Sequence, residues 1–303
     1  MDQPIREHEE KVEREGRLRW QSRFLLVLVL PISAAGLSSL ASQRPTPATV
    51  EGLALCAAFG LLVWLLRAAT PLAAMTGFLL TSCMYLGTTR QPHGGWFHTA
   101  LVPGLALFVL AFVATRFRRR QKEQRGLAES RKGRGAAQVT ANMGAAALAA
   151  LALEPGSLPL LHLFAHGYTP TGPILFAPLV AALAEAAADT VSSEVGQALG
   201  GSPFMIIGLK RVNPGTDGAL SAAGTAAGLI AAAMVVLVAV PALGLETRQA
   251  GTAWTAAVLG LFVDSLLGAT LERGGWLNND AVNFLSTALA AGAALAAPTW
   301  LHW

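Results

Sequence analysis

Long apolar stretches follow one another along this chain, and only short polar stretches separate them. Each apolar stretch is long enough, with some tilt, to cross about 30 Å of hydrocarbon as a helix. The pattern therefore predicts an all-α fold, a polytopic helical membrane bundle of about nine transmembrane helices. The expected spans are Phe24–Leu40, Val50–Leu66, Pro71–Leu86, Phe97–Thr115, Gln138–Leu153, Ile174–Leu199, Ala219–Val240, Trp254–Leu271 and Val282–Pro298.

Two charged stretches divide the chain into four regions. Residues 1–21 interleave acidic and basic side chains and are expected to form a charged cytoplasmic N-terminal helix. Residues 22–115 are expected to be a four-helix membrane scaffold region. Residues 116–135 carry nine Lys or Arg against two Glu, which the positive-inside rule assigns to a basic cytoplasmic loop. Residues 136–303 are then the membrane catalytic core.

This topology predicts which side of the membrane each feature occupies. The N-terminus lies inside and the C-terminus outside, with the polar motifs at the cytoplasmic face. The expected location is a bacterial inner membrane, with the active site at its cytoplasmic face.

The composition excludes an ordinary soluble domain. Of the 303 residues, 53% are hydrophobic and 13% are charged, whereas soluble domains average about 25% charged residues. The mean hydropathy is +0.49. A net charge of +4 could suit a nucleic acid, but the basic residues concentrate beside apolar segments. We therefore expect contact with membrane lipids and no nucleic acid, and the oligomeric state stays open.

The sixth apolar segment contains acidic residues that need a compensating interaction. A carboxylate facing lipid costs about 2.5 to 3.5 kcal/mol on insertion scales. Glu194 lies about 140° round a helix from Asp189, so it joins the same site only if the helix breaks or another element wraps round it. Such carboxylates suit Mg²⁺, which also takes phosphate oxygens, or alternatively form a buried network between helices. The polar stripe of this helix consists of Glu185, Asp189, Ser192, Ser193 and Gly196.

The sequence NPGTDG, residues 213–218, is typical of a turn before a helix. Pro214 restricts φ, glycines permit close backbone approach, and Thr216 or Asp217 could cap the helix. Backbone amides there, near Lys210 and Arg211, could bind phosphate. A plain turn between helices remains the alternative. Downstream, Gly224 and Gly228 form a GxxxG step that predicts close helix packing.

The eighth apolar segment, Trp254–Leu271, also contains an acidic residue. Asp264, Ser265 and Gly268 share one helical face. A group of amide and acidic side chains follows at its end: Asn278, Asn279, Asp280 and Asn283. A carboxylate within a membrane span, next to such a group, indicates a polar site.

Four motifs, in order, carry a family resemblance: RGLAESRKGRGAAQVTANMG, DTVSSEVG, RVNPGTDGALSAAGTAAG and VDSLLGATLE. With them the chain resembles the integral-membrane family that contains plant phytyl-phosphate kinase and its bacterial relatives, long classed as a domain of unknown function. The resemblance implies a Mg²⁺-dependent phosphotransferase. Its expected reaction transfers the terminal phosphoryl group of CTP, or another nucleoside triphosphate, to phytyl or geranylgeranyl phosphate, giving the diphosphate.

The resemblance and the polar motifs together suggest roles for individual residues. The expected catalytic set is Asp189, Glu194, Asp264 and Lys210. The Mg²⁺ ligands would come from Asp189, Glu194, Asp264 and Asp280. The phosphate groups of substrate or nucleotide would contact Arg131, Lys132, Asn142, Arg211, Gly215, Thr216, Asp217, Gly218, Ser221, Ser265 and Asn283. Arg134, in the same basic loop as Arg131 and Lys132, is a further candidate for attracting phosphate.

Three other functions are alternatives to a prenyl-phosphate kinase. An isoprenoid alcohol kinase would phosphorylate a hydroxyl, with Asp189 acting as a base. An ion-coupled transporter would use the same carboxylates to bind a proton or cation. A non-catalytic membrane scaffold would leave both the GTDG turn and Asp264 without a role.

Overall fold

The computed structural model describes residues 13, 16–89, 95–128, 132–152, 176–199 and 201–300, with side chains up to residue 297. The helices in order are α2 (Arg19–Gln43), α3 (Pro47–Leu65), α4 (Pro71–Thr88), η1 (Trp96–His98), α5 (Leu101–Arg116), α6 (Arg119–Gln124), α7 (Ala136–Ala152), α9 (Phe176–Leu199), α10 (Ala222–Leu243), α11 (Thr247–Leu267), the π-helical turn η3 (Gly268–Glu272) and α12 (Asn279–Trp300). The proposed N-terminal helix over 1–21 falls mostly outside the described residues.

Several of these helices are suited to cross a membrane. In the described part of the chain, five are long and apolar enough: α2, α3, α10, α11 with η3, and α12. Two more, α5 and α7, are shorter apolar helices. Each of the nine apolar segments expected from the sequence overlaps a helix in its described part, although Ala219 and Leu220 belong to a strand. The all-α membrane bundle is thus confirmed, whereas the exact number of spans stays a prediction.

The starts of α3 and α4 follow from local sequence. In each, a threonine accepts a hydrogen bond from the backbone N–H three residues on, and a proline occupies the first helical position. Proline lacks the N–H that would be unsatisfied there, and its φ already suits a helix. The two threonines are Thr46 and Thr70, and both N–H···O distances are 3.3 Å.

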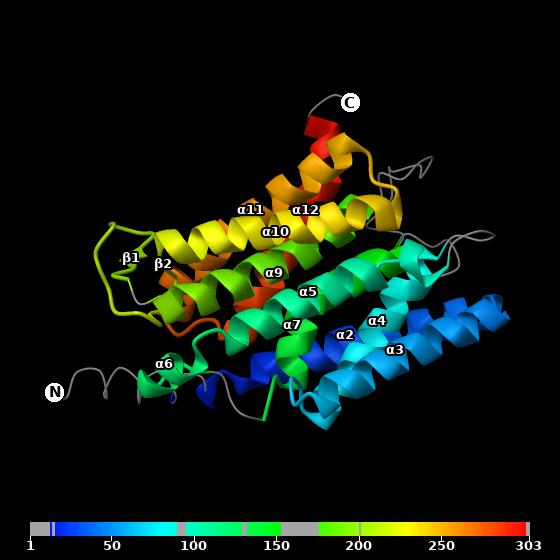
Figure 1. Ribbon diagram of the computed structural model, residues 1–303, viewed down its shortest axis with the longest axis horizontal. Coiled ribbons are helices and arrows are strands. Elements are labelled where there is room, and N and C mark those ends of the chain that lie inside the picture. Colours follow the sequence, from blue (N-terminus) through cyan, green and yellow to red (C-terminus); the bar gives the residue numbers. More distant parts are fainter. Residues whose placement is uncertain are drawn as a thin grey trace.

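Helix α9 is the centre of the bundle. It packs against α5, α7, α10, α11 and α12, and Figure 1 shows it running between α5 and α10. Every residue from 176 to 188 is buried. Many of these residues are alanines, whose small side chains let the neighbouring helices approach closely. The acidic residues of α9 are therefore covered by other helices instead of facing lipid.

The GxxxG step is the contact that brings α10 onto α9. A Cβ on Gly224 would lie 2.5 Å from the Ser192 carbonyl oxygen, and one on Gly228 would lie 2.7 Å from that of Ala188. Only glycine fits at these distances, so the predicted packing role is confirmed.

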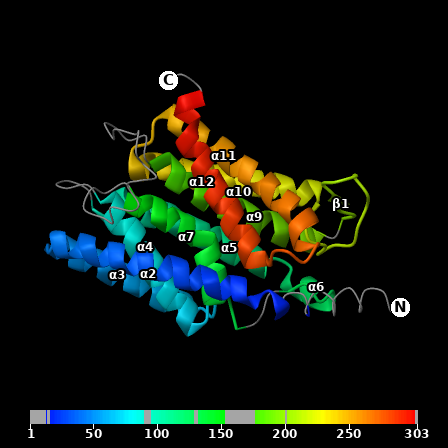
Figure 2. The ribbon, with the colours of Figure 1, turned by 180° about the vertical axis from the view of Figure 1, so that it is seen from behind.

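The first helices form a layer against α7. Helices α2 and α4 pack on α7, and α3 packs on α4. Figure 2 shows α2 and α3 along one side of the molecule, away from α10 and α11. One hydrophobic core nonetheless includes side chains from both parts, such as Val29 of α2 and Leu183 of α9. The proposed scaffold and catalytic regions therefore share one bundle.

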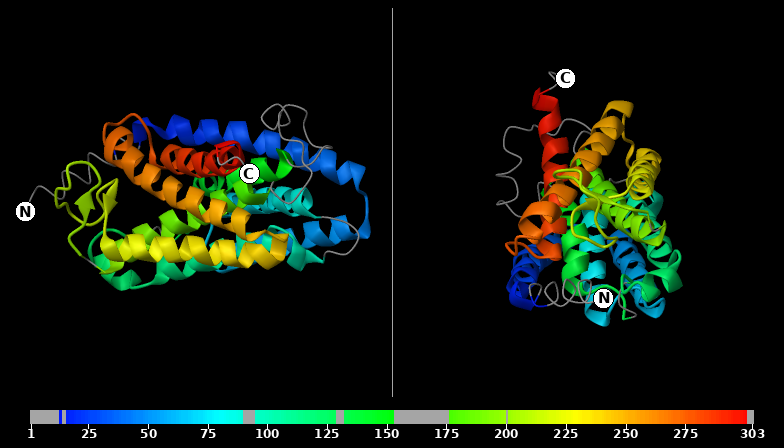
Figure 3. Two further views of the ribbon diagram at one scale, coloured as in Figure 1. Left: turned by 90° about the horizontal axis from the view of Figure 1, so that it is seen from above. Right: turned by 90° about the vertical axis from the view of Figure 1, so that its left-hand side faces the viewer.

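One end of the bundle carries a small antiparallel ribbon, in which β1 (Phe204–Met205) pairs with β2 (Ala219–Leu220). Figure 3 shows this ribbon at the same end as α6 and the turn after α11. Because β2 separates the NPGTDG turn from α10, the helix cap falls on Ser221, which accepts a hydrogen bond from Gly224 N at 3.1 Å. The expected cap at Thr216 or Asp217 was wrong for this reason.

Candidate active site

A polar cavity of about 330 Å³ opens at the ribbon end of the bundle. Its walls come from the start of α7, the last turns of α9, the loop between the ribbon strands, α11 with η3, and the start of α12. The structure thus gathers parts of all four sequence motifs into one site. The predicted site residues that line it are Asn142, Asp189, Glu194, Gly215, Thr216, Asp217, Gly218, Ser221, Asp264, Ser265 and Asn283.

Two carboxylates from different helices meet in this cavity. Asp189 of α9 and Asp264 of α11 lie close enough to interact electrostatically. Asp264 Oδ2 also accepts a hydrogen bond from Ser286 Oγ at 3.2 Å. Glu185, one helical turn further from the ribbon end than Asp189, is only 1% exposed. The carboxyl groups of Asp189 and Asp264 are therefore the ones that both line the cavity and face each other.

The donor set of the polar cavity fits a magnesium ion. Among the described residues, no group of three or more His, Cys, Asp or Glu side chains gathers in a metal-binding arrangement. Mg²⁺ does not require one, since it is usually bound by one or two carboxylates together with waters and substrate phosphate oxygens. Asp189 and Asp264 supply such a pair of hard oxygen ligands.

The glycine-rich turn is seated directly on the π-helical turn η3. Gly218 has φ +73°, and a Cβ there would lie 2.1 Å from the backbone nitrogen of Ala269. A Cβ on Gly268 would in turn lie 2.8 Å from Gly218 N. Single π-helical turns often occur at functional sites. This contact holds the loop beside Ser265, which lines the same cavity.

Glu194 forms an ion pair with a lysine from another helix. Lys122 of α6 is fully buried and forms an ion pair with the Glu194 carboxylate. Its ammonium group also donates to the carbonyl oxygens of Ala114 at 3.1 Å and Thr115 at 2.9 Å. Helix α6 thus packs against the last turns of α9. Glu194 lines the cavity, yet its carboxylate is engaged in joining α5, α6 and α9.

Replacing Lys122 by alanine is expected to lower the free energy of unfolding by about 3 kcal/mol, because it leaves the Glu194 carboxylate buried without its cation. The thermal midpoint in detergent measures the effect. The comparison is Lys132→Ala, which removes an exposed lysine of the same basic region and should change the midpoint little. Equal midpoints for the two variants would contradict a stabilising role for the buried pair.

Three predicted cationic residues do not line the cavity. Lys210 and Arg211 are exposed and lie in the loop between the two ribbon strands, where Met205 N donates to the Lys210 carbonyl oxygen at 2.9 Å. Lys132 is likewise exposed. Arg131 lies outside the described residues.

Asp280 faces α2 instead of the cavity. Its Oδ2 accepts a hydrogen bond from Ser22 Oγ at 2.6 Å. Next to it, Asn278 Nδ2 donates to Ser22 Oγ at 2.9 Å, and Gln21 Nε2 donates to the Trp276 carbonyl oxygen at 2.8 Å. This network fastens the start of α2 to the loop before α12. The geometry therefore assigns Asp280 a structural contact at the edge of the site.

Arg134, a phosphate candidate from the basic loop, lines the cavity, as do four polar residues to which the sequence motifs gave no role: Gln138, Thr190, Glu272 and Asn279. Arg134 Nη2 donates to Thr190 Oγ1 at 3.3 Å. The backbone of Arg134 pairs with the segment that precedes α4, because Arg134 N donates to the Ala68 carbonyl oxygen at 2.9 Å. Of the two phosphate candidates from this loop that the structure describes, Arg134 lines the cavity and Lys132 does not.

The chain is similar to proteins from several kinds of organism. It is 34% identical over 233 residues to an uncharacterized membrane protein of Synechocystis sp., covering 76% of this chain and 85% of that protein. It is 32% identical over 192 residues to the protein VTE6, chloroplastic, of Arabidopsis thaliana, covering 61% of this chain and 54% of the plant protein. An uncharacterized membrane protein of Methanocaldococcus jannaschii is 37% identical over 128 residues, covering 38% of this chain and 53% of that protein.

No solved structure matches the chain significantly. The sequence profile of the family described as integral membrane protein DUF92 matches residues 54–291, which is well over half of the chain and includes every motif of the polar cavity. The chain therefore belongs to the DUF92 family of integral membrane proteins.

Proposed function

We propose that this protein is a prenyl-monophosphate kinase that transfers the terminal phosphoryl group of a nucleoside triphosphate, with CTP the expected donor, to phytyl or geranylgeranyl phosphate. The observation that carries the proposal is the polar cavity itself. It contains a carboxylate pair, an arginine and a glycine-rich loop at the end of a membrane bundle. The similarity to the plant protein VTE6, which covers about half of that protein, and the resemblance to phytyl-phosphate kinase support it.

The reaction requires little covalent chemistry from the protein. A phosphate oxygen of the acceptor forms a bond to the terminal phosphorus of the donor, and the bond from that phosphorus to the bridging oxygen breaks, releasing the nucleoside diphosphate. The attacking oxygen is already anionic, so no strong general base is needed. The protein must instead hold two polyanions in line and neutralise their charge.

The chain's own residues suit those tasks. Arg134 can bind acceptor phosphate, since guanidinium pairs with phosphate in a bidentate fashion. The loop amides of Gly215 to Gly218 can bind donor phosphates. Asp189 and Asp264 would hold Mg²⁺, which when bound shares phosphate oxygens of the donor and offsets their charge. Glu194 would keep its place through Lys122, as a positioning residue for the end of α9.

The site would open toward the cytoplasm. Basic side chains surround the end of the bundle that carries the polar cavity, with Arg118, Arg120 and Arg125 all exposed near α6. Positively charged loops remain on the cytoplasmic side during insertion. The same charge would raise the local concentration of anionic nucleotide.

The test is release of nucleoside diphosphate by purified protein in detergent with Mg²⁺ and CTP. Phytyl phosphate, geranylgeranyl phosphate, the corresponding alcohols and a lipid-free control are compared. Release that depends on a monophosphate is the expected result. Release only with alcohol would replace the proposal by an alcohol kinase. Absence of release with every acceptor, and with ATP, from folded protein would overturn it, and ion flux into liposomes would then test the transporter alternative.

A further inference from the structure

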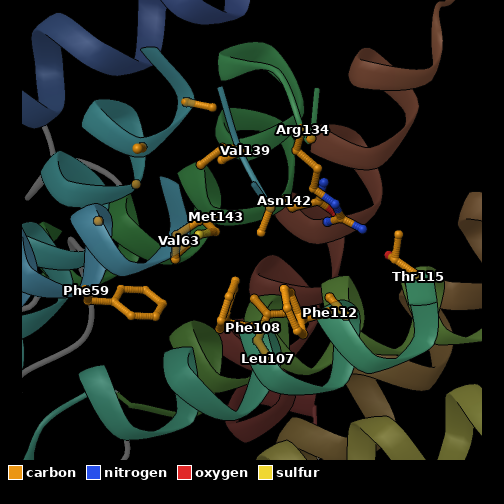
Figure 4. A pocket seen from close by; sticks show the side chains of 18 of the residues that line it. Phe59, Val63, Leu107, Phe108, Phe112, Thr115, Arg134, Val139, Asn142 and Met143 are labelled. Carbon is orange, nitrogen blue, oxygen red and sulfur yellow. The ribbon is translucent and has the colours of Figure 1, made fainter. Parts of the chain in front are cut away.

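A second cavity, the apolar groove, lies between α3, α4, α5 and α7. Aromatic and aliphatic side chains form most of its wall, and Figure 4 shows Phe108 and Phe112 of α5 facing Met143 of α7, with Phe59 of α3 beyond them. Phe59 and Phe108 meet edge to face, with ring centroids 5.3 Å apart. The groove is therefore shaped for an apolar chain and has no polar group along most of its described length.

The apolar groove meets the polar cavity at two residues. Arg134 and Asn142 line both, and Figure 4 shows them together at one end of the groove, with Phe59 at the other. Asn142 is 7% exposed, and its Nδ2 donates to the Gln138 carbonyl oxygen at 2.8 Å. Its Oδ1 is buried and has no hydrogen-bond partner within the described residues. A buried amide oxygen of this kind normally accepts from a partner, so it requires a donor such as an ordered water or the hydroxyl of a singly ionised phosphate.

Positive charge gathers at the same end of the groove. Arg67, Arg116 and Arg119 line it together with Arg134. Arg116 Nη2 donates to the Leu66 carbonyl oxygen at 3.0 Å, and its guanidinium lies 3.5 Å from the centre of the Phe112 ring. These contacts keep a cation at the boundary between the aromatic wall and the polar end. An apolar channel with a cationic mouth complements a molecule with an apolar tail and an anionic head.

We propose that the apolar groove binds the isoprenoid chain of the acceptor, and that Arg134 and Asn142 orient its phosphate toward Asp189 and Asp264 in the polar cavity. This assignment rests on the proposed function. It names the acceptor subsite, and it makes Phe59, Phe108 and Met143 the side chains that set which chains fit. Bulk phospholipid, which also has a tail and an anionic head, is the competing occupant that the test must exclude.

Gly77 offers a way to fill the groove without disturbing the fold. It lines the groove from α4, and a Cβ there would meet no atom within 4 Å. Gly77→Leu is expected to raise the Kd for geranylgeranyl phosphate about tenfold, the scale on which one or two misfitting methylenes act. Leucine also favours a helix over glycine. The matched control is Gly292→Leu on α12, where the same open space lies outside the groove and binding should not change.

A photoreactive geranylgeranyl phosphate with a diazirine near the end of its chain locates the occupant directly. Protein in phosphatidylcholine nanodiscs, without nucleotide, is irradiated, and labelled peptides are identified by mass spectrometry. The expected labels fall on groove residues of α3, α5 and α7. Excess unlabelled geranylgeranyl phosphate should remove them, whereas phosphatidic acid should not. If Gly77→Leu folds poorly, Gly104→Leu fills the groove from α5, where a Cβ would contact only Met84 Cε, at 3.8 Å.

The outcomes separate this inference from the proposed function. Labels in the groove with no phosphoryl transfer would overturn the kinase and leave the subsite standing. Transfer that depends on prenyl phosphate, with labels outside the groove or a Gly77→Leu variant that binds normally, would overturn the subsite alone. Labels removed equally by phosphatidic acid would assign the groove to ordinary lipid and overturn the subsite as well.

Discussion

Replacing Asp264 by asparagine is expected to lower the rate of phosphoryl transfer on the order of 100- to 1000-fold, the usual effect of removing one preorganised electrostatic contact. The carboxylate lies in the polar cavity beside that of Asp189, so the substitution removes half of the charge that would hold Mg²⁺. Asparagine has the same shape and can still accept a hydrogen bond from Ser286. The fold should therefore survive, and Asp189→Asn should have a similar effect.

The measurement is kcat/KM for nucleoside diphosphate release, with Mg²⁺ varied at each substrate concentration. The matched comparison is Asp280→Asn, which also removes an acidic group near the cavity but one that hydrogen-bonds with Ser22 of α2. It should retain near-normal turnover. Near-normal rates for Asp264→Asn would remove that residue from the metal site, and a large loss for Asp280→Asn would return Asp280 to it.

Replacing Gly218 by alanine is expected to lower turnover by about 100-fold, because a displacement of 1 Å at a reacting site can cost that much. A Cβ would come within 2.1 Å of Ala269 N and 2.5 Å of the Ser265 carbonyl oxygen. Both are backbone atoms that cannot rotate away. The loop would have to leave η3 and could no longer line the cavity in the same way.

A control must distinguish the effect of positive φ at Gly218 from the effect of displacing the loop. Gly244 serves as the control, because it also has positive φ, +66°, yet a Cβ there would meet no atom within 4 Å. Gly244→Ala should lose stability through its positive φ alone and keep its turnover. Thermal midpoints and initial rates of the two variants give the comparison. Equal rates would mean that the seating of the loop on η3 does not matter for the reaction.

Much of the fold followed from local pattern. Hydrocarbon solvent leaves a spanning segment little choice but a helix, because every backbone N–H and C=O must be satisfied within the segment. The apolar stretches therefore predicted the helices closely, from Pro47–Leu65 to Ala222–Leu243. Spacing of three and four residues likewise predicted a polar stripe on α9, where Asp189, Ser192 and Ser193 do line one cavity.

The interaction partners of the charged residues could not be predicted from the local sequence pattern. Residues 116–135 contain nine cations of similar character, yet Lys122 became a buried ion-pair partner and Arg134 a cavity residue while Lys132 stayed exposed. Nothing in their immediate neighbours distinguishes them. The difference arises from where α6 and the segment before α7 contact α9, which depends on the path of the whole chain.

Asp280 and the apolar groove also depend on contacts between segments that are far apart in the sequence. Asp280 belongs to an Asn/Asp cluster at the mouth of the site, but the start of α2, far away in sequence, provides its hydrogen bond from Ser22. The groove is formed by side chains from four helices, none of which looks unusual alone. The sequence was enough to specify a membrane bundle with an acidic, glycine-rich site, because periodicity and burial cost act within single segments. Packing between segments decided the rest. It determined that Arg134 lines the site, that Asp280 does not, and where an apolar chain fits, because those contacts exist only after the helices have met.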